Sequence, residues 1–327
     1  MVCWCCPGKN VLIVKKIILK SEKRVQAVKF SIVTPSYNSQ RFIGETIESV
    51  IGQKGNFHIE YIIVDACSTD RTPEIVKAYQ QSLLTGERPI FCGHVTIKFL
   101  SGKDAGMYEA INKGFAQATG DIYAWINSDD VYQPGAFDVI CKTFSQFPQI
   151  RWLKGITSYF DESSTLFASG KCNIYNRQLI AKGLYGPVLH FIQQDSVFWS
   201  ASLWHESGGA DESLSLAGDY FLWIEFSKYT PLYSLNAHTS CFRSVAGQKS
   251  ENIQAYFCEI SDKGYPSPGD YRFLRFYFKH RKRIPSFLQP LARRLFQFNY
   301  NYRVVLMNPY NTLTLVEGPH HEVETYL

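Results

Sequence analysis

Short apolar runs alternate with amphipathic stretches through the first half of the chain. Four runs have the length and the bordering turn residues of buried strands, at residues 30–35, 60–65, 95–100 and 122–127. Four stretches between and after them carry apolar residues at helical spacing, at residues 39–53, 68–81, 107–118 and 134–147. This alternation predicts an α/β fold in which helices flank a mostly parallel sheet.

The pattern weakens after residue 148. Residues 151–160 are expected to form a pair of strands, and residues 219–228 a strongly apolar-periodic helix. Near residue 260 the chain becomes basic and aromatic. We therefore expect a less regular second half and a separate C-terminal segment.

Polar side chains follow the expected strands at their carboxyl ends, and four of them are Asn38, Asp65, Asp104 and Asp129. Ligands of parallel sheets bind at this edge, so these side chains are candidates for one site. Asp130 adds a second carboxylate beside Asp129. Neighbouring carboxylates suit a hard divalent cation that keeps phosphate oxygens among its ligands. The alternative is a solvated turn, because Ser-Asp-Asp commonly satisfies loose backbone groups.

Asp65 closes an apolar strand, where a carboxylate is costly unless it meets a hydrogen-bond donor of the protein or of a ligand. Capping of the next helix is the alternative, although Ser68 and Thr69 are better placed to cap it. The residue types therefore favour ligand binding at Asp65.

Composition indicates an ordinary globular protein rather than a disordered or secreted one. The 327 residues are 45% hydrophobic and 19% charged. The nine cysteines are odd in number, and six are scattered, which does not suit a disulfide framework. Cys3, Cys5 and Cys6 form a CxCC group that suits a metal, a lipid or a plain terminal extension. No apolar run reaches the length of a membrane span, and we expect a cytoplasmic protein.

The positive charge is concentrated near the C-terminus. Residues 271–303 contain nine Lys or Arg and no acid, whereas the whole chain has a net charge of +5. Cations interleaved with aromatics suit either nucleic acid or helices that contact an anionic membrane surface, peripheral on the inner face of the cell membrane. The resemblance described below, and not the composition, favours the membrane over nucleic acid, and a packed helical subdomain with solvated arginines is the plain alternative.

Five motifs in order carry a resemblance to a known family. They are TPSYN (34–38), VDACSTDRT (64–72), SGKDAGMYEAINKG (101–114), INSDD (126–130) and GGADESLSLAGDYFLW (208–223). Their order and spacing resemble family 2 glycosyltransferases, whose GT-A fold has a Rossmann-like sheet. The resemblance implies inverting transfer of a sugar from a nucleotide diphosphate, expected to be UDP, with Mn²⁺ or Mg²⁺. The acceptor would be a hydroxyl of a glycan or lipid-linked molecule, in the synthesis of a polysaccharide.

The resemblance also implies roles for individual residues. The nucleotide would contact Pro35, Tyr37, Asp65, Lys103, Asp104 and Asp129. Asp65 would accept a hydrogen bond from the base, and Asp130 would hold the metal. Near the donor or acceptor sugar we expect Gln193, Gln194 and Trp223. His190 and His238 stay open as further metal ligands.

Asp219 is the expected general base. It begins the helix at residues 219–228, so the alternative is a helix N-cap. The resemblance places a base here, and inverting transfer needs one carboxylate to take the proton of the acceptor hydroxyl. Related chains carry Arg, His and Ser near the diphosphate. Arg243 and Ser250 are present, but Val245 or Ala246 stands at the His position.

The expected organisation has three parts. Residues 1–28 are an N-terminal extension, and residues 259–327 are a helical, basic and aromatic segment. Between them, residues 29–258 form the GT-A domain, divided into a nucleotide-binding half (29–148) and an acceptor-binding half (149–258).

Two other nucleotide-binding classes lack their motifs in this sequence. A dehydrogenase needs GxGxxG after the first strand, and a P-loop enzyme needs Gly-Lys followed by Ser or Thr. The remaining alternative is a nucleotide-sugar-binding protein or inactive relative without turnover.

Overall fold

The computed structural model describes residues 27–267, 302–308 and 310–318, with residues 271, 272, 276, 280, 283, 285, 288 and 323 in addition. The CxCC group at Cys3, Cys5 and Cys6 lies outside the described residues, as does most of the basic segment 271–303.

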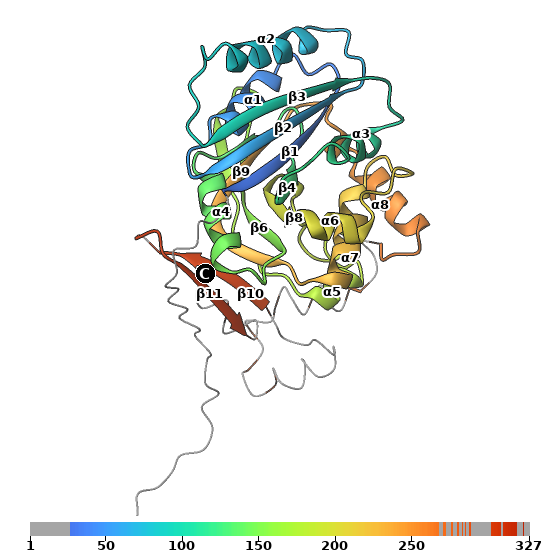
Figure 1. Cartoon of the computed structure of the whole chain (residues 1–327). Helices are drawn as coiled ribbons and strands as arrows, with labels where there is room; N and C mark the ends of the chain where they lie inside the picture. Colours follow the sequence, from blue (N-terminus) through green and yellow to red (C-terminus); the bar gives the residue numbers. More distant parts are fainter. Residues whose placement is uncertain are drawn as a thin grey trace, which may run out of the picture.

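Eleven strands of the described chain form one sheet (Figure 1). They are β1 (Val28–Ser36), β2 (Phe57–Asp65), β3 (His94–Ser101), β4 (Ile122–Trp125), β5 (Val131–Tyr132), β6 (Trp152–Phe160), β7 (Leu166–Ser169), β8 (Val197–Ser200), β9 (Tyr233–Arg243), β10 (Tyr302–Met307) and β11 (Leu313–Gly318).

The helices of the described chain lie between these strands. They are α1 (Ile43–Ile51), α2 (Thr72–Leu84), α3 (Met107–Phe115), α4 (Ala136–Gln146), α5 (Arg177–Ala181), α6 (Ala201–Ser207), α7 (Gly218–Tyr229) and α8 (Ile253–Asp262), with the short 3₁₀ helices η1 (Gln194–Ser196) and η2 (Lys249–Glu251). No described helix is both long and apolar enough to cross a bilayer.

The sheet confirms the predicted α/β architecture, with the order β11-β10-β9-β6-β8-β4-β1-β2-β3. β1 pairs in parallel with β2 and β4, and β2 pairs in parallel with β3. β8 runs antiparallel between β4 and β6 and joins the two halves of the sheet. The carboxyl ends of β1, β2 and β4 therefore meet at one edge.

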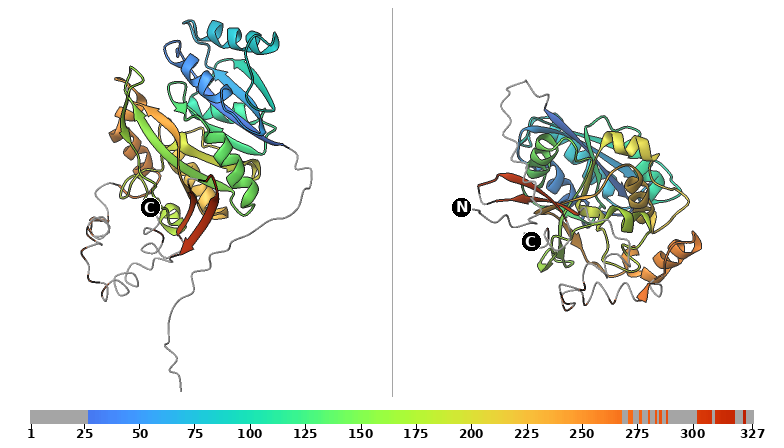
Figure 2. Two further views of the ribbon diagram at one scale, coloured as in Figure 1. Left: turned by 90° about the vertical axis from the view of Figure 1, so that its left-hand side faces the viewer. Right: turned by 90° about the horizontal axis from the view of Figure 1, so that it is seen from below.

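Two sequence predictions differ from the structure. The expected strand pair at 151–160 is a single strand, β6, and its partner β7 comes from the following residues. The C-terminal segment was expected to be helical, but β10 pairs with β9 and extends the sheet. Figure 2 shows the β10–β11 hairpin at one end of the fold. The domain boundary near residue 258 stays a prediction.

Two hydrophobic clusters cover the two faces of the sheet. Because side chains alternate along a strand, Ala124 of β4 faces one cluster, and Tyr123 and Trp125 face the other. The first cluster contains apolar residues of α1, α2 and α4, and the second those of α3, α5, α6 and α7. In the second cluster Trp125 stacks on Trp223, with ring centroids 5.8 Å apart. This aromatic packing lies directly behind the edge where the strands end.

A buried carboxylate connects the parallel strands by hydrogen bonds near their amino-terminal ends. Glu60 of β2 accepts hydrogen bonds from Lys98 Nζ at 2.8 Å, Ser31 Oγ at 2.6 Å and the Thr119 backbone N–H at 2.7 Å. Burial raises the pKa of Glu60, but these bonds and the charge of Lys29 outweigh it and lower that pKa to about 2. Glu60 therefore stays ionised and joins β1, β2, β3 and the turn before β4.

We predict that Glu60→Gln lowers the free energy of unfolding by roughly 2–4 kcal/mol at pH 7, because it leaves buried donors without their charged acceptor. The folded-state pKa of Glu60 lies below its ordinary value, so its contribution is complete above about pH 4.5 and is lost as the pH falls toward 2. Urea unfolding at pH 7 and pH 3.5 measures both effects.

Glu48→Gln is the matched control. Glu48 pairs with Arg88 at 2.6 Å, but its side chain is 47% exposed, so the expected cost is below about 1 kcal/mol. Equal losses in the two variants, or a Glu60→Gln effect that does not shrink in acid, would contradict the prediction.

Candidate functional site

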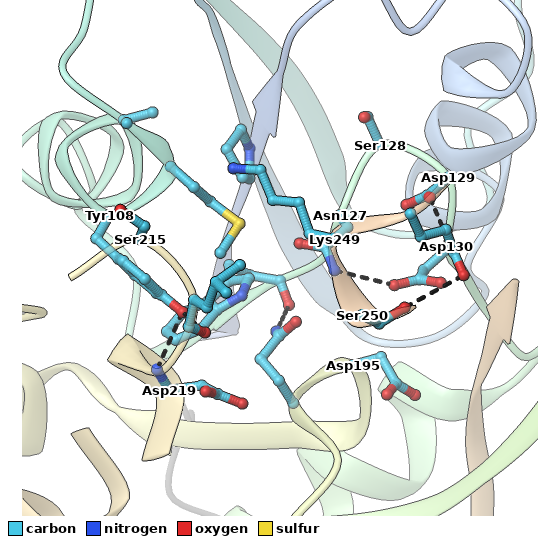
Figure 3. A pocket seen from close by; sticks show the side chains of 18 of the residues that line it. Tyr108, Asn127, Ser128, Asp129, Asp130, Asp195, Ser215, Asp219, Lys249 and Ser250 are labelled. Atoms are coloured by element: carbon cyan, nitrogen blue, oxygen red, sulfur yellow. Dashed lines mark hydrogen bonds between the residues drawn. The ribbon is translucent and has the colours of Figure 1, made fainter. Parts of the chain in front are cut away.

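A cavity of about 910 Å³ opens at the carboxyl ends of β1 and β4 (Figure 3). Its walls come from the turn after β4, the loop before α3, η1, the start of α7 and the segment from η2 into α8. Segments from both halves of the sheet thus surround one space, as expected for a site at this edge.

Eight of the predicted site residues line this cavity: Pro35, Tyr37, Asp104, Asp129, Asp130, Gln193, Gln194 and Asp219. Tyr37 is 62% exposed, which leaves its ring accessible for stacking. The structure brings Asp130 and Asp219 to one cavity, although they are 89 residues apart in the sequence.

Asp65, Lys103 and Trp223 do not line the cavity. Asp65 is fully buried and accepts hydrogen bonds from Ser68 N–H at 2.9 Å and Ser101 Oγ at 3.1 Å. Trp223 belongs to the aromatic core because the apolar periodicity of α7 points it there. The ligand contacts expected of these three residues stay predictions.

The two histidines considered as metal ligands lie elsewhere. The Nδ1 of His238 is 2.9 Å from Ser158 Oγ, and the ring of His190 packs 5.1 Å from that of Tyr175. Neither histidine is among the residues that line the cavity.

A buried arginine at the end of β9 holds the turn that carries the paired acids. The guanidinium of Arg243 donates to the Asp129 carbonyl from Nε at 2.8 Å, to Ser164 Oγ at 2.7 Å and to Glu45 Oε2 at 2.7 Å. Its backbone N–H donates to Asp130 Oδ1 at 2.8 Å. The resemblance implied an arginine near a diphosphate, but Arg243 is only 1% exposed and points into these bonds, not into the cavity.

The paired acids are largely buried and close together, which makes their ionised forms costly. Burial raises the pKa of Asp130 well above its usual range, and the charges of Asp129 and Asp195 raise it further, against the bonds from Arg243 and Asn127. Burial also raises the pKa of Asp129. All of these acids line the cavity and leave carboxylate oxygens there without a cationic partner.

The donor set fits a hard divalent cation. Asn127 Oδ1 is buried and accepts no hydrogen bond in the described structure, and Asn127 lines the cavity beside Asp130. An unpaired amide oxygen next to carboxylates is what Mg²⁺ or Mn²⁺ binds. No group of three or more His, Cys, Asp or Glu is positioned for a metal in the described residues, so phosphate oxygens would have to complete the coordination.

Asp219 lies in the first turn of α7, apart from the paired acids in Figure 3. The N-cap position is Ala217, so Asp219 does not cap the helix. Its Oδ1 accepts from the Tyr220 backbone N–H at 2.7 Å and from Tyr256 OH at 3.2 Å. Burial raises the pKa of Asp219 to about 6, although these two bonds oppose the rise. A carboxylate with this pKa can take up and release a proton near neutral pH.

Several cavity residues were missing from the predicted site. Lys249 lies in the segment after Arg243, where Val245, Ala246 and Ser250 were compared with related chains from the sequence. Tyr108 lies in the motif SGKDAGMYEAINKG (101–114). Tyr256 lies in α8, where no pattern distinguishes it from other half-buried aromatics of an amphipathic helix. Only the fold brings it to Asp219.

Comparison with known proteins identifies related sequences and similar folds. Residues 31–163 match the model described as Glycosyl transferase family 2. The chondroitin synthase of Escherichia coli is 24% identical over 241 residues, which cover 73% of this chain and 32% of that protein. The chain thus spans about a third of the length of this relative.

Two solved structures share the fold at low sequence identity. Staphylococcus aureus TarS 1-349 in complex with UDP-GlcNAc matches with a TM-score of 0.53 and 17% identity, covering 68% of this chain and 61% of that chain. A mannosyltransferase from Pyrobaculum calidifontis in complex with GDP-Man and Mn²⁺ matches with a TM-score of 0.50 and 14% identity, covering 78% and 70%.

We predict that Arg243→Lys lowers the free energy of unfolding by roughly 2–4 kcal/mol, because an ammonium cannot reproduce the planar fork that binds three segments at once. Urea unfolding at pH 7 measures the loss. Arg41→Lys is the control, since Arg41 also lies over the Phe42 ring and pairs with a glutamate, Glu162, but is 58% exposed. The expected cost there is under about 1 kcal/mol. The interpretation is wrong if both variants lose the same stability.

Proposed function

Because the chain belongs to glycosyl transferase family 2, a family of sugar-transferring enzymes, we propose that it moves a sugar from a nucleotide diphosphate donor to an acceptor hydroxyl. The observation that carries the proposal is the placement of Asp129 and Asp130 in the same cavity as Asp219. The first pair suits a cation-bound diphosphate, and Asp219 suits a proton acceptor.

The donor is proposed to be a UDP-sugar bound along the strand ends. Pro35 and the exposed ring of Tyr37 would contact the base, and Asp104 the ribose. Asp65 would reach the base only if a donor group of the ligand approaches its remaining acceptor positions, since Ser68 and Ser101 already bond it. The UDP-GlcNAc and GDP-Man complexes of the two solved relatives support a nucleotide sugar and leave the base open.

Asp130, Asp129 and Asn127 would hold Mn²⁺ or Mg²⁺ together with the diphosphate. A cation bound there neutralises negative charge on the departing diphosphate. Two hydrogen bonds hold Asp130 in place. The Arg243 N–H donates to its Oδ1, and Thr46 Oγ1 donates to its carbonyl oxygen at 2.8 Å.

Asp219 is proposed to act as the general base of a single displacement. The acceptor oxygen forms a bond to the anomeric carbon while the bond from that carbon to the diphosphate oxygen breaks on the opposite face. The acceptor proton goes to Asp219, and the bonding pair leaves with the nucleoside diphosphate. One base and one attack give inversion, whereas a retained configuration would require a second nucleophile.

The acceptor is proposed to be a hydroxyl of a glycan or a lipid-linked molecule. Gln193 and Gln194 line the cavity at η1, and Gln194 Nε2 donates to the Trp125 carbonyl at 2.5 Å. Contact of residues 271–303 with an anionic membrane stays a prediction, because most of that segment lies outside the described residues. The alternative, a nucleotide-sugar-binding protein without turnover, would bind the donor but release no nucleoside diphosphate.

We predict that Asp219→Asn slows donor turnover by about 100-fold or more, because the base is removed while the cavity keeps its shape. Nucleoside diphosphate release is measured with UDP-, dTDP- and GDP-sugars plus Mn²⁺, with water or a glycan as acceptor. Asp211→Asn is the control, since Asp211 is exposed and pairs with Lys263 outside the cavity. Wild-type turnover in Asp219→Asn would exclude the proposed base.

The pH dependence follows from the same group. The base must be ionised, and the pKa of Asp219 is about 6, so the rate is expected to fall about tenfold per pH unit below that value. A rate that stays constant from pH 7 down to pH 4.5 would contradict this assignment.

A cation requirement tests the paired acids. We expect Mn²⁺ and UDP together to raise the melting temperature more than the sum of their separate effects, because each completes the binding site of the other. EDTA should abolish the gain, and Asp130→Asn should remove it, whereas Asp211→Asn should keep it. Equal stabilisation of Asp130→Asn and the wild type would place the cation elsewhere.

A further inference from the structure

Asp219 presents its two carboxylate oxygens in different environments. Oδ1 accepts two hydrogen bonds, from the Tyr220 backbone N–H and from Tyr256 OH. No hydrogen bond from the described part of the chain reaches Oδ2, and Asp219 lines the cavity. One oxygen is therefore anchored, and the other is available to a ligand.

Two tyrosine hydroxyls lie beside Asp219, but only one donates to its carboxylate. Tyr108 OH donates to the Leu216 carbonyl at 2.7 Å and accepts from the Asp219 backbone N–H at 3.4 Å. A tyrosine has a single hydroxyl proton, so Tyr108 has none left for the carboxylate. Tyr256 is the side chain whose proton points to Oδ1.

The position of Tyr256 is fixed by a second contact of the same helix. Glu259, one turn further along α8, accepts from the backbone N–H groups of Ser215 and Leu216 at 3.0 Å and of Ala217 at 2.8 Å. These three residues lead directly into α7. The carboxylate thus holds α8 against the beginning of the helix that carries Asp219.

We propose that Tyr256 is a positioning residue for the general base: its hydroxyl anchors Asp219 Oδ1, stabilises the ionised carboxylate and leaves Oδ2 turned toward the acceptor hydroxyl. This inference rests on the proposed function, because it assigns Tyr256 a task only if Asp219 takes a proton.

Electrostatics support the direction of this effect. A hydrogen bond to the charged form of a carboxyl group lowers its pKa, and the bond from Tyr256 opposes the burial that raises the pKa of Asp219. Burial also raises the pKa of Tyr256 well above its ordinary value, so its hydroxyl keeps its proton. The other ionisable groups around Asp219 are Tyr108 of α3, Glu259 of α8 and Lys249 across the cavity. All of them remain in a Tyr256→Phe variant.

The direct test is the titration of Asp219 by ¹³C NMR of the full chain labelled at aspartate carboxyl carbons, without substrate or metal. The signal is assigned by its loss in Asp219→Asn. In Tyr256→Phe the midpoint is expected to rise by about 0.5–1 pH unit, a threefold to tenfold change in the acid dissociation constant. Tyr123→Phe is the control, since it removes a buried hydroxyl, bonded to the Ala118 carbonyl, outside the cavity.

The functional test is the pH profile of nucleoside diphosphate release with UDP-GlcNAc and Mn²⁺. The acidic limb should move upward in Tyr256→Phe by the same amount, with most of the rate regained at pH 8. A purely structural role would lower the rate at every pH without moving the limb.

The possible failures separate the two proposals. If Asp219→Asn keeps its turnover, the proposed base is wrong. If Asp219→Asn is inactive but the midpoint in Tyr256→Phe is unchanged, the base stands and the role of Tyr256 is overturned. A midpoint that moves equally in Tyr123→Phe would also overturn it.

Discussion

The site depends on one buried guanidinium. Arg243 sits at the end of β9 and bonds the Asp129 carbonyl, Ser164 and Glu45, which belong to three segments far apart in sequence. Removing such a group from water costs several kcal/mol unless each N–H finds an acceptor, so these segments can adopt few other arrangements. The turn after β4 is thereby fixed to β9 and α1, and with it the direction of both acids. In addition to the pairing of β8 with β4 and β6, this requirement connects the two halves of the sheet at the place where the cavity opens.

The same contacts leave the paired acids without a salt bridge in the described part of the chain, and burial raises the pKa of both. The charge of Arg243 is paired with Glu45 rather than with Asp129 or Asp130, and only its backbone N–H reaches the Asp130 carboxylate. Among the salt bridges of the described residues, none involves Asp219. A guanidinium placed on the acids would stabilise the empty protein and compete with a cation for the same oxygens. The described structure thus keeps two largely buried carboxyl groups side by side without a cationic partner, and this arrangement is the basis for the proposed binding of a cation-bound diphosphate.

The sequence was informative wherever local pattern decides the outcome. Apolar runs and helical spacing predicted the strands and helices of the first half, and the acids at strand ends predicted the position of the cavity. Pattern alone was insufficient for long-range pairing: β10 joins β9 across more than sixty residues, a contact that no local signal encodes. Pattern alone also could not place Trp223, because the apolar spacing of α7 is the same whether the ring packs in the core or contacts a sugar. Its ring stacks on Trp125 in the core.

The carboxyl groups at the two ends of the cavity lie in different electrostatic surroundings. At one end of the cavity Asp129 and Asp130 lie beside the unpaired amide oxygen of Asn127, and no group of three His, Cys, Asp or Glu side chains is positioned for a metal in the described residues. The other end has a single buried carboxyl group, Asp219, whose pKa of about 6 lets it gain or lose a proton near neutral pH. Burial alone would make Asp219 hold its proton too firmly, whereas a lysine partner would make it too weak a base. Neutral donors have an intermediate effect on the pKa. A hydroxyl and an amide N–H offset part of the rise that burial causes, without cancelling the negative charge of the carboxylate. The identity of the donors beside Asp219, and not its burial alone, therefore sets the pKa of its carboxyl group.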